Sequence, residues 1–194
     1  GCVPAGTDSL AVVPPGTDVR ISVGNQSNTV HTFTSLVFPE GAQHMPFDQP
    51  EAFRNGSRAV TLEDPGLYVF VCKVHPFMLA ATVVDDPATA GLDMGENISL
   101  VNGITVPTTS DLATRLLRAF WLITNPLNYQ DHNPRTNPGL TWTINYPAGV
   151  PVRIAGGAVV DLKDTLEARY GNNLPIEGPS KPAEKGVGAG EQLD

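Results

Sequence analysis

Four side chains of the kinds that bind soft metal ions occur at spacings that allow them to meet. Cys72, His75 and Met78 lie within one seven-residue stretch, and His31 precedes Cys72 by 41 positions. A thiolate, two imidazoles and a thioether form a soft donor set, and copper that cycles between Cu(I) and Cu(II) is the metal that suits such a set. We therefore predict a mononuclear copper site with these four residues as ligands.

The elements around these residues must deliver them to one point. Residues 67–72 form an apolar run typical of a buried strand, and the stretch that follows is short enough for a tight loop. Residues 30–38 predict a second strand, which carries His31. A strand ending at Cys72, a loop holding His75 and Met78, and a neighbouring strand with His31 would together close the site.

The overall composition favours strands over helices. The chain has 194 residues, of which 41% are hydrophobic and 16% charged, and it contains 19 glycines and 18 prolines. This abundance of turn-forming residues predicts short strands separated by turns. Further strands are expected at residues 19–23, 57–62 and 80–84, so the first part of the chain is predicted to be an all-β sandwich.

The composition changes around residues 85–87, where we place a boundary between a first domain (residues 1–87) and an extension (88–194). The residues that follow the boundary contain few large apolar groups and predict a linker or long loop. Ser110 is expected to cap a helix that runs through residue 123. The helix face expected to pack on the sandwich consists of apolar residues at helical spacing, namely Leu112, Leu116, Ala119, Phe120 and Ile123.

The rest of the extension is predicted to hold little regular structure. Strands are expected at residues 140–146 and 150–154, followed by a short helix at 162–170. From about residue 175 the chain is rich in Pro, Gly, Lys and Glu, which predicts an irregular tail. The extension is thus expected to contain one long helix and a few strands.

The sequence around the donors resembles the cupredoxin family. Cys-x-x-His-Pro-Phe-Met at residues 72–78, after Pro-Gly-x-Tyr-x-Phe at 65–70, resembles the ligand loop of these type 1 (blue) copper proteins, and its short spacing is most similar to that of amicyanin. Val-His-Thr-Phe-Thr at 30–34 resembles the strand that supplies the family's first histidine. The resemblance covers residues 10–85 and implies a cupredoxin-like Greek-key β-sandwich.

The resemblance also implies a role for each donor. His31, Cys72 and His75 are expected to be strong equatorial ligands of one type 1 copper ion, and Met78 a weak, long axial ligand. Thr32 or its neighbours are expected to hydrogen-bond toward the cysteine segment, which would keep the site rigid in both oxidation states. The implied function is one-electron transfer between redox partner proteins, and the chain is not expected to be an enzyme.

The loop histidine of the family protrudes through an apolar surface and provides the route for electrons. By this resemblance, a redox partner protein is expected to dock near His75, Pro76 and Phe77, and residues 45–47 could enlarge the apolar surface. Two features depart from the family pattern. A strand usually precedes the equivalent of Leu10, and residues 140–146 are a candidate replacement for it. Minimal electron carriers also lack residues 88–194, which are expected to pack on the sandwich or to dock a partner.

Charge and hydropathy restrict the partners and the location. The formal net charge is −8, the pI is near 4.8 and there is no run of Lys or Arg, so nucleic-acid binding is not expected. No apolar stretch reaches the roughly 18 residues of a membrane-spanning helix. Residues 1–4, Gly-Cys-Val-Pro, resemble the start of a processed bacterial lipoprotein, so Cys2 is a candidate lipid anchor. The expected location is the periplasm, the cell surface or the extracellular space.

Other functions stay open. The chain could be a redox subunit of a larger respiratory or oxidase complex, or a copper chaperone or storage protein. Four histidines without a His-x-His pair disfavour a trinuclear oxidase centre, and three methionines are few for a protein that hands copper on. The same ligands could hold zinc, or the domain could have lost its metal. His44 beside Met45 could bind a second metal, although a surface loop histidine is the favoured interpretation.

Overall fold

The computed structural model describes residues 10–23, 29–42, 56–75, 78–124, 141–171 and 173–175. Some predictions concern residues outside these ranges, and they stay predictions. They are the lipid anchor at Cys2, the metal at His44, the apolar residues 45–47, Pro76 and Phe77, and the tail beyond residue 175.

The fold is built on a six-stranded sheet faced by a two-stranded one. The strands of the large sheet are, in spatial order, β1 (Leu10–Val13), β6 (Leu79–Val84), β5 (Gly66–Val71), β3 (Thr34–Pro39), β8 (Asn97–Leu100) and β9 (Thr105–Pro107). Only the β1–β6 pair is parallel among these described neighbours. β2 (Thr17–Val23) and β4 (Gly56–Leu62) form the antiparallel pair on the other side of the sandwich. The predicted β-sandwich is confirmed.

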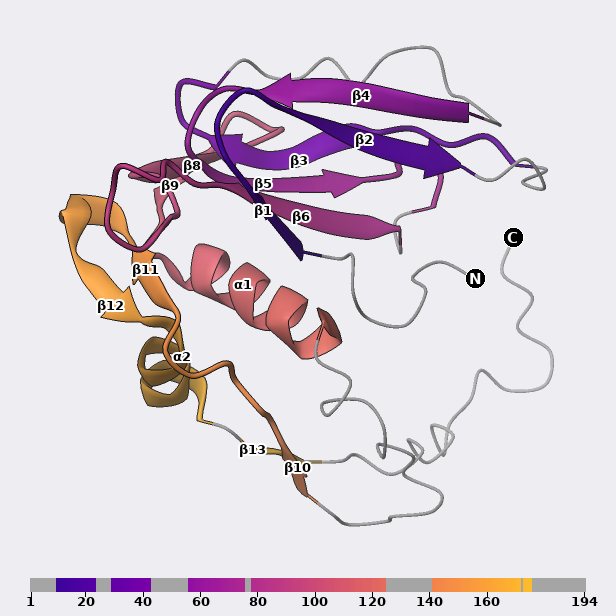
Figure 1. Cartoon of the computed structure of the whole chain (residues 1–194). Helices are drawn as coiled ribbons and strands as arrows, with labels where there is room; N and C mark the ends of the chain where they lie inside the picture. The colour runs from indigo at the N-terminus through magenta and orange to yellow at the C-terminus, as the bar shows by residue number, and fades with distance from the viewer. Residues whose placement is uncertain are drawn as a thin grey trace, which may run out of the picture.

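Strand β5 shows why the large sheet lies in the middle of the molecule. Side chains alternate between the two faces of a strand, and in β5 both sets are buried. Tyr68 and Phe70 pack in the core that includes Leu62 of β4. Leu67 and Val69 pack in a second core, which includes residues of the extension. A nearly continuous apolar run is expected of a strand covered on both faces, and Figure 1 shows the β2–β4 pair on one side and α1 on the other.

The extension supplies the layer on that second face. Its elements after β8 and β9 are α1 (Asp111–Thr124), β10 (Thr141–Thr143), β11 (Pro151–Arg153), a 3-10 helix (Ala155–Gly157), β12 (Val159–Asp161), α2 (Leu162–Tyr170) and β13 (Asn173–Pro175). β11 pairs with β12 and, in parallel, with β7 (Leu92–Asp93), while β10 pairs with β13. The boundary at residue 87 stays a prediction, and the described residues on its two sides share one apolar core.

The two helices begin and end close to the predicted positions. The Ser110 hydroxyl accepts a hydrogen bond from the Ala113 backbone N–H at 3.4 Å, which satisfies one of the free N–H groups at the start of α1. α2 spans residues 162–170, as predicted, and the Asp161 side chain caps it by accepting from the backbone N–H groups of Lys163 and Asp164. The helix predictions are therefore confirmed in their bounds.

The predicted buried face of α1 is wrong in part. Ala113, Leu117 and Phe120 are buried at 1%, 4% and 0% exposure, whereas Leu112 is 38% exposed. Leu112 lies about 100° around the helix from Ala113, because each residue advances by that angle. The apolar residues of α1 extend around more than one face, so their spacing alone did not identify the side that packs on the sheet.

Two further predictions about the extension are wrong. The stretch after residue 87 is not a linker, because β8 and β9 join the large sheet, with Val37 opposite Leu100 and Pro39 opposite Ile98. Residues 140–146 do not replace a strand of the sandwich, since β10 pairs with β13 instead. Ile144 and Tyr146 still contribute to the core beneath the sheet.

Candidate metal centre

Cys72 is the first residue after strand β5, and it is 4% exposed. Three backbone hydrogen bonds determine the shape of the loop that follows. The N–H of His75 donates to the carbonyl of Cys72 at 3.1 Å, the N–H of Met78 donates to the carbonyl of His75 at 2.8 Å, and the N–H of Cys72 donates to the carbonyl of Met78 at 3.1 Å. Strand and loop together fix where the backbones of Cys72, His75 and Met78 lie.

His31 precedes strand β3, which is the neighbour of β5 in the sheet. Its side chain is 7% exposed. Two hydrogen bonds tie the adjacent Thr32 to the cysteine segment: the Thr32 N–H donates to Cys72 Sγ at 3.3 Å, and the Thr32 hydroxyl accepts from the Lys73 N–H at 2.8 Å. The predicted contact between Thr32 and the cysteine segment is confirmed, and it fixes His31 relative to Cys72.

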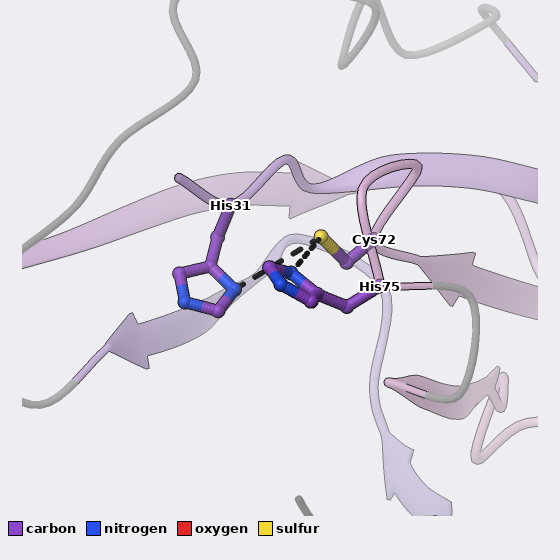
Figure 2. A group of neighbouring side chains, drawn as sticks. All are labelled: His31, Cys72 and His75. Carbon is purple, nitrogen blue, oxygen red and sulfur yellow. Dashed lines mark hydrogen bonds between the residues drawn. The ribbon is translucent and has the colours of Figure 1, made fainter. Parts of the chain in front are cut away.

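The three nearest donors converge on one point. Cys72 Sγ lies 3.6 Å from His75 Nδ1 and 4.0 Å from His31 Nδ1, and the three donor atoms all lie within 4.8 Å of one another. Figure 2 shows both imidazole rings turned toward the sulfur, His31 from the segment before β3 and His75 from the loop after β5. The ring centroids of the two histidines are 4.8 Å apart, with an angle of 35° between the ring planes.

These separations fit a single metal ion. Bonds of about 2.0–2.3 Å, as in zinc sites, arranged at the angles of a three- or four-ligand centre would separate a nitrogen from the sulfur by about 3.6–3.8 Å. The two observed nitrogen–sulfur distances lie at or just above that range. One thiolate and two imidazoles are soft and borderline donors, and this chemistry suits copper.

The surroundings of His31 also favour metal binding. Burial, and to a smaller extent the charge of His75, lower the pKa of His31 below its ordinary value. A lowered pKa favours the neutral imidazole, which has a nitrogen lone pair available. Neutral imidazole is the form that binds metals.

The backbone of Met78 is hydrogen-bonded to the loop that holds Cys72 and His75. Met78 is half-buried and begins the segment that leads into β6. The two backbone hydrogen bonds that join it to Cys72 and His75 keep it at the same end of the sheet as the other donors. Its part as fourth ligand stays a prediction.

Two buried aromatic rings pack against each other close to the donors along the chain. Phe33, two residues after His31, and Phe70, two residues before Cys72, are buried in contact, with ring centroids 4.4 Å apart. Both belong to the core between the two sheets. Because each ring is two positions from a donor, this contact fixes the spacing of the two strand segments that carry the donors.

One residue near the donors was not predicted. The Thr29 hydroxyl lies 3.2 Å from His31 Nε2, on the opposite side of the ring from Nδ1. The sequence signal is a hydroxyl residue two positions before a histidine, and such pairs are too common to be recognised without the structure.

No helix among the residues that the structure describes is long and apolar enough to cross a membrane. Cys72 is free of any disulfide.

Comparison with known proteins finds no matching family model and no matching curated protein. Solved structures do match. Pseudoazurin from Sinorhizobium meliloti is 29% identical over 41% of this chain and 60% of that protein, with a TM-score of 0.31. A copper-containing nitrite reductase from Thermus scotoductus is 23% identical over 41% of this chain and 20% of that protein, with a TM-score of 0.29. Amicyanin from Paracoccus versutus is 20% identical over 43% of this chain and 85% of that protein, with a TM-score of 0.29. The chain spans less than two thirds of the first two proteins. The similarity to the three covers 41–43% of this chain.

Proposed function

We propose that this chain transfers single electrons through one type 1 copper ion held by His31, Cys72 and His75, with Met78 as a weak axial ligand. The observation that carries the proposal is that one ligand atom from each of His31, Cys72 and His75 lies within 4.8 Å of the others, with Sγ 3.6 Å from His75 Nδ1 and 4.0 Å from His31 Nδ1. Copper, when bound, supplies the one-electron Cu(II)/Cu(I) couple. The fold supplies a donor set that is held in place by strands, by loop hydrogen bonds and by Thr32.

Rigidity is the property that such a function needs. An electron carrier is fast only if its ligands move little between oxidation states, and ligands fixed by packing and hydrogen bonds satisfy this requirement. Cys72 accepts a hydrogen bond from the Thr32 N–H, and its own backbone N–H is bonded within the loop. The sulfur and the backbone of Cys72 are thus each restrained by a hydrogen bond that needs no metal.

The route for electrons is proposed to pass through His75. His31 is buried, whereas His75 is only partly buried and belongs to a loop in which Val74 is 53% exposed. An exposed apolar residue beside the more accessible ligand suits brief docking of a redox partner protein, since small, weak interfaces separate quickly. The partner is proposed to dock near His75, Pro76 and Phe77. The chain would act as a carrier rather than as an enzyme, outside the cytoplasm, with Cys2 as a candidate anchor.

Two other functions stay in view. The match to one part of a copper-containing nitrite reductase leaves room for a role as a redox subunit of a larger complex. A copper chaperone or storage protein would use an exchangeable site, and the buried Cys72 and His31 argue against that alternative.

Copper titration with paired cysteine variants tests the proposal. Cu(II) is added to the wild type, to Cys72→Ser and to Cys2→Ser, and visible absorption is recorded before and after ascorbate. We expect a strong red-region band in the wild type and in Cys2→Ser that bleaches reversibly on reduction, because copper–thiolate bonding requires Cys72. Cys72→Ser should be colourless. A band retained in Cys72→Ser would contradict the ligand assignment, and loosely bound, colourless Cu(I) in the wild type would favour copper delivery.

A further inference from the structure

The two ring nitrogens of His31 have different surroundings. Nδ1 lies 4.0 Å from Cys72 Sγ, and Nε2 lies 3.2 Å from the Thr29 hydroxyl. A neutral imidazole carries its proton on one nitrogen only, so one nitrogen donates and the other accepts. If Nδ1 binds a metal, the proton must be on Nε2, and that N–H can then donate to Thr29.

We propose that Thr29 is a positioning residue for the metal ligand His31. With the proton on Nε2, its hydroxyl accepts the Nε2–H and orients the ring so that the Nδ1 lone pair is directed toward Cys72. The inference rests on the proposed copper site and adds to it a residue that orients one ligand. Partners that bond the second nitrogen of a ligand histidine fix both its tautomer and its orientation.

Burial gives this contact its importance. His31 is 7% exposed and Thr29 is exposed, so this hydrogen bond joins a buried ring to a residue at the surface. A buried N–H that loses its acceptor is destabilised, because water cannot reach it freely. Removal of the hydroxyl should therefore allow the ring to rotate, and rotation withdraws Nδ1 from the metal.

Residues 29–32 contain two threonines that contact proposed ligands. Thr29 bonds the far nitrogen of His31, and Thr32 bonds the sulfur of Cys72 and the backbone of the next residue. The two threonines thus act on different ligands. Loss of the Thr29 hydroxyl should weaken the copper–imidazole interaction and leave the copper–thiolate bond formed.

Variants of Thr29 test the inference by copper affinity. Thr29→Val removes the hydroxyl and keeps the shape, and Thr29→Ser restores the hydroxyl. Affinity for Cu(II) is measured by competition with a chelator. We expect Thr29→Val to bind about 10–100-fold more weakly than the wild type and Thr29→Ser to stay within about threefold of it. Thr61→Val is the matched control: the Thr61 hydroxyl donates to the Asp18 carboxylate at 2.6 Å at an exposed position on β2 and β4, and its loss should leave copper affinity unchanged.

A second measurement uses the wild type and does not depend on the folding of any variant. Nitrogen NMR of the diamagnetic Cu(I) protein reports which nitrogen of His31 carries the proton. The proton is expected on Nε2. A proton on Nδ1, or a Thr29→Val variant with wild-type affinity, or a Thr29→Ser variant as weak as Thr29→Val, would overturn the inference. A wild type that binds copper in a Cys72-dependent way would meanwhile leave the proposed function standing.

Discussion

The two faces of the large sheet are covered in different ways. On one face, β2 and β4 enclose a core rich in aromatic residues, which include Tyr68, Phe70 and Phe33. On the other face, α1 and α2 enclose a larger core that includes Leu117, Phe120 and Leu166. Two aromatic residues of the first core, Phe33 and Phe70, each lie two positions along the chain from a donor, and their rings are in contact. We infer that the first core sets the geometry of the site and that the second mainly stabilises the sheet.

Paired aromatic deletions should separate these two contributions. Phe120→Ala and Phe70→Ala each remove a buried ring, and each should lower the free energy of unfolding by about 3–5 kcal/mol, measured by urea unfolding. Only Phe70→Ala should also change the visible spectrum of the copper-loaded protein, because Phe70 contacts Phe33 next to the site. An altered spectrum in Phe120→Ala together with an unaltered one in Phe70→Ala would reverse the assignment of roles to the two cores.

The burial of Tyr68 in the first core should make the stability of the protein depend on pH. The Tyr68 hydroxyl donates to the Asp64 carbonyl at 3.0 Å, and burial, followed by the nearby Asp64 charge, raises the pKa of Tyr68. A raised folded-state pKa means that the unfolded chain loses the phenol proton first as pH increases. The stability linked to Tyr68 is therefore complete below its ordinary pKa of about 10 and declines at higher pH.

Tyr68→Phe should lack the pH-dependent contribution of the phenol to the free energy of unfolding. At pH 7 it should be less stable by about 0.5–1.5 kcal/mol, through loss of one hydrogen bond. Between about pH 9 and 11 its free energy of unfolding should fall less steeply than that of the wild type, as followed by denaturant unfolding at each pH. Parallel pH profiles for the two proteins would show that Tyr68 does not remain protonated in the fold.

The smallest change in unfolding free energy is expected for substitution of Leu112, on the outer face of α1. Leu112 is 38% exposed and Leu117 is 4% exposed, although both are leucines on one helix. Leu117→Ala should cost about 2–5 kcal/mol of unfolding free energy, and Leu112→Ala within about 0.5 kcal/mol. Equal losses would indicate that the outer face of α1 is covered in solution.

The sequence was sufficient for the features that depend on local chemistry. Cys72, His75 and Met78 are near one another in the chain, so one short loop must bring them together, and Ser110 marks the start of α1 by a side-chain cap. Features that depend on partners distant in sequence were harder to predict. β8 is short, and Ile98 is its only fully buried residue. Such a strand lacks the apolar pattern by which a strand is recognised.

The same reason explains the error in α1 and the omission of Thr29. The apolar residues of α1 do not fall on one narrow stripe, so the buried side depends on where the sheet and the C-terminal strands lie. Thr29 matters only because the chain turns to place its hydroxyl beside His31 Nε2. Neither arrangement leaves a distinctive pattern in the order of residues.

X-ray absorption at the copper edge of the loaded protein tests the central claim most directly, because it counts the atoms bonded to the metal. The account predicts one short copper–sulfur bond and two copper–nitrogen bonds with the outer-shell scattering of imidazole, and loss of the sulfur contribution in Cys72→Ser. A copper ion surrounded only by nitrogen and oxygen, or a sulfur contribution that persists in Cys72→Ser, would contradict it.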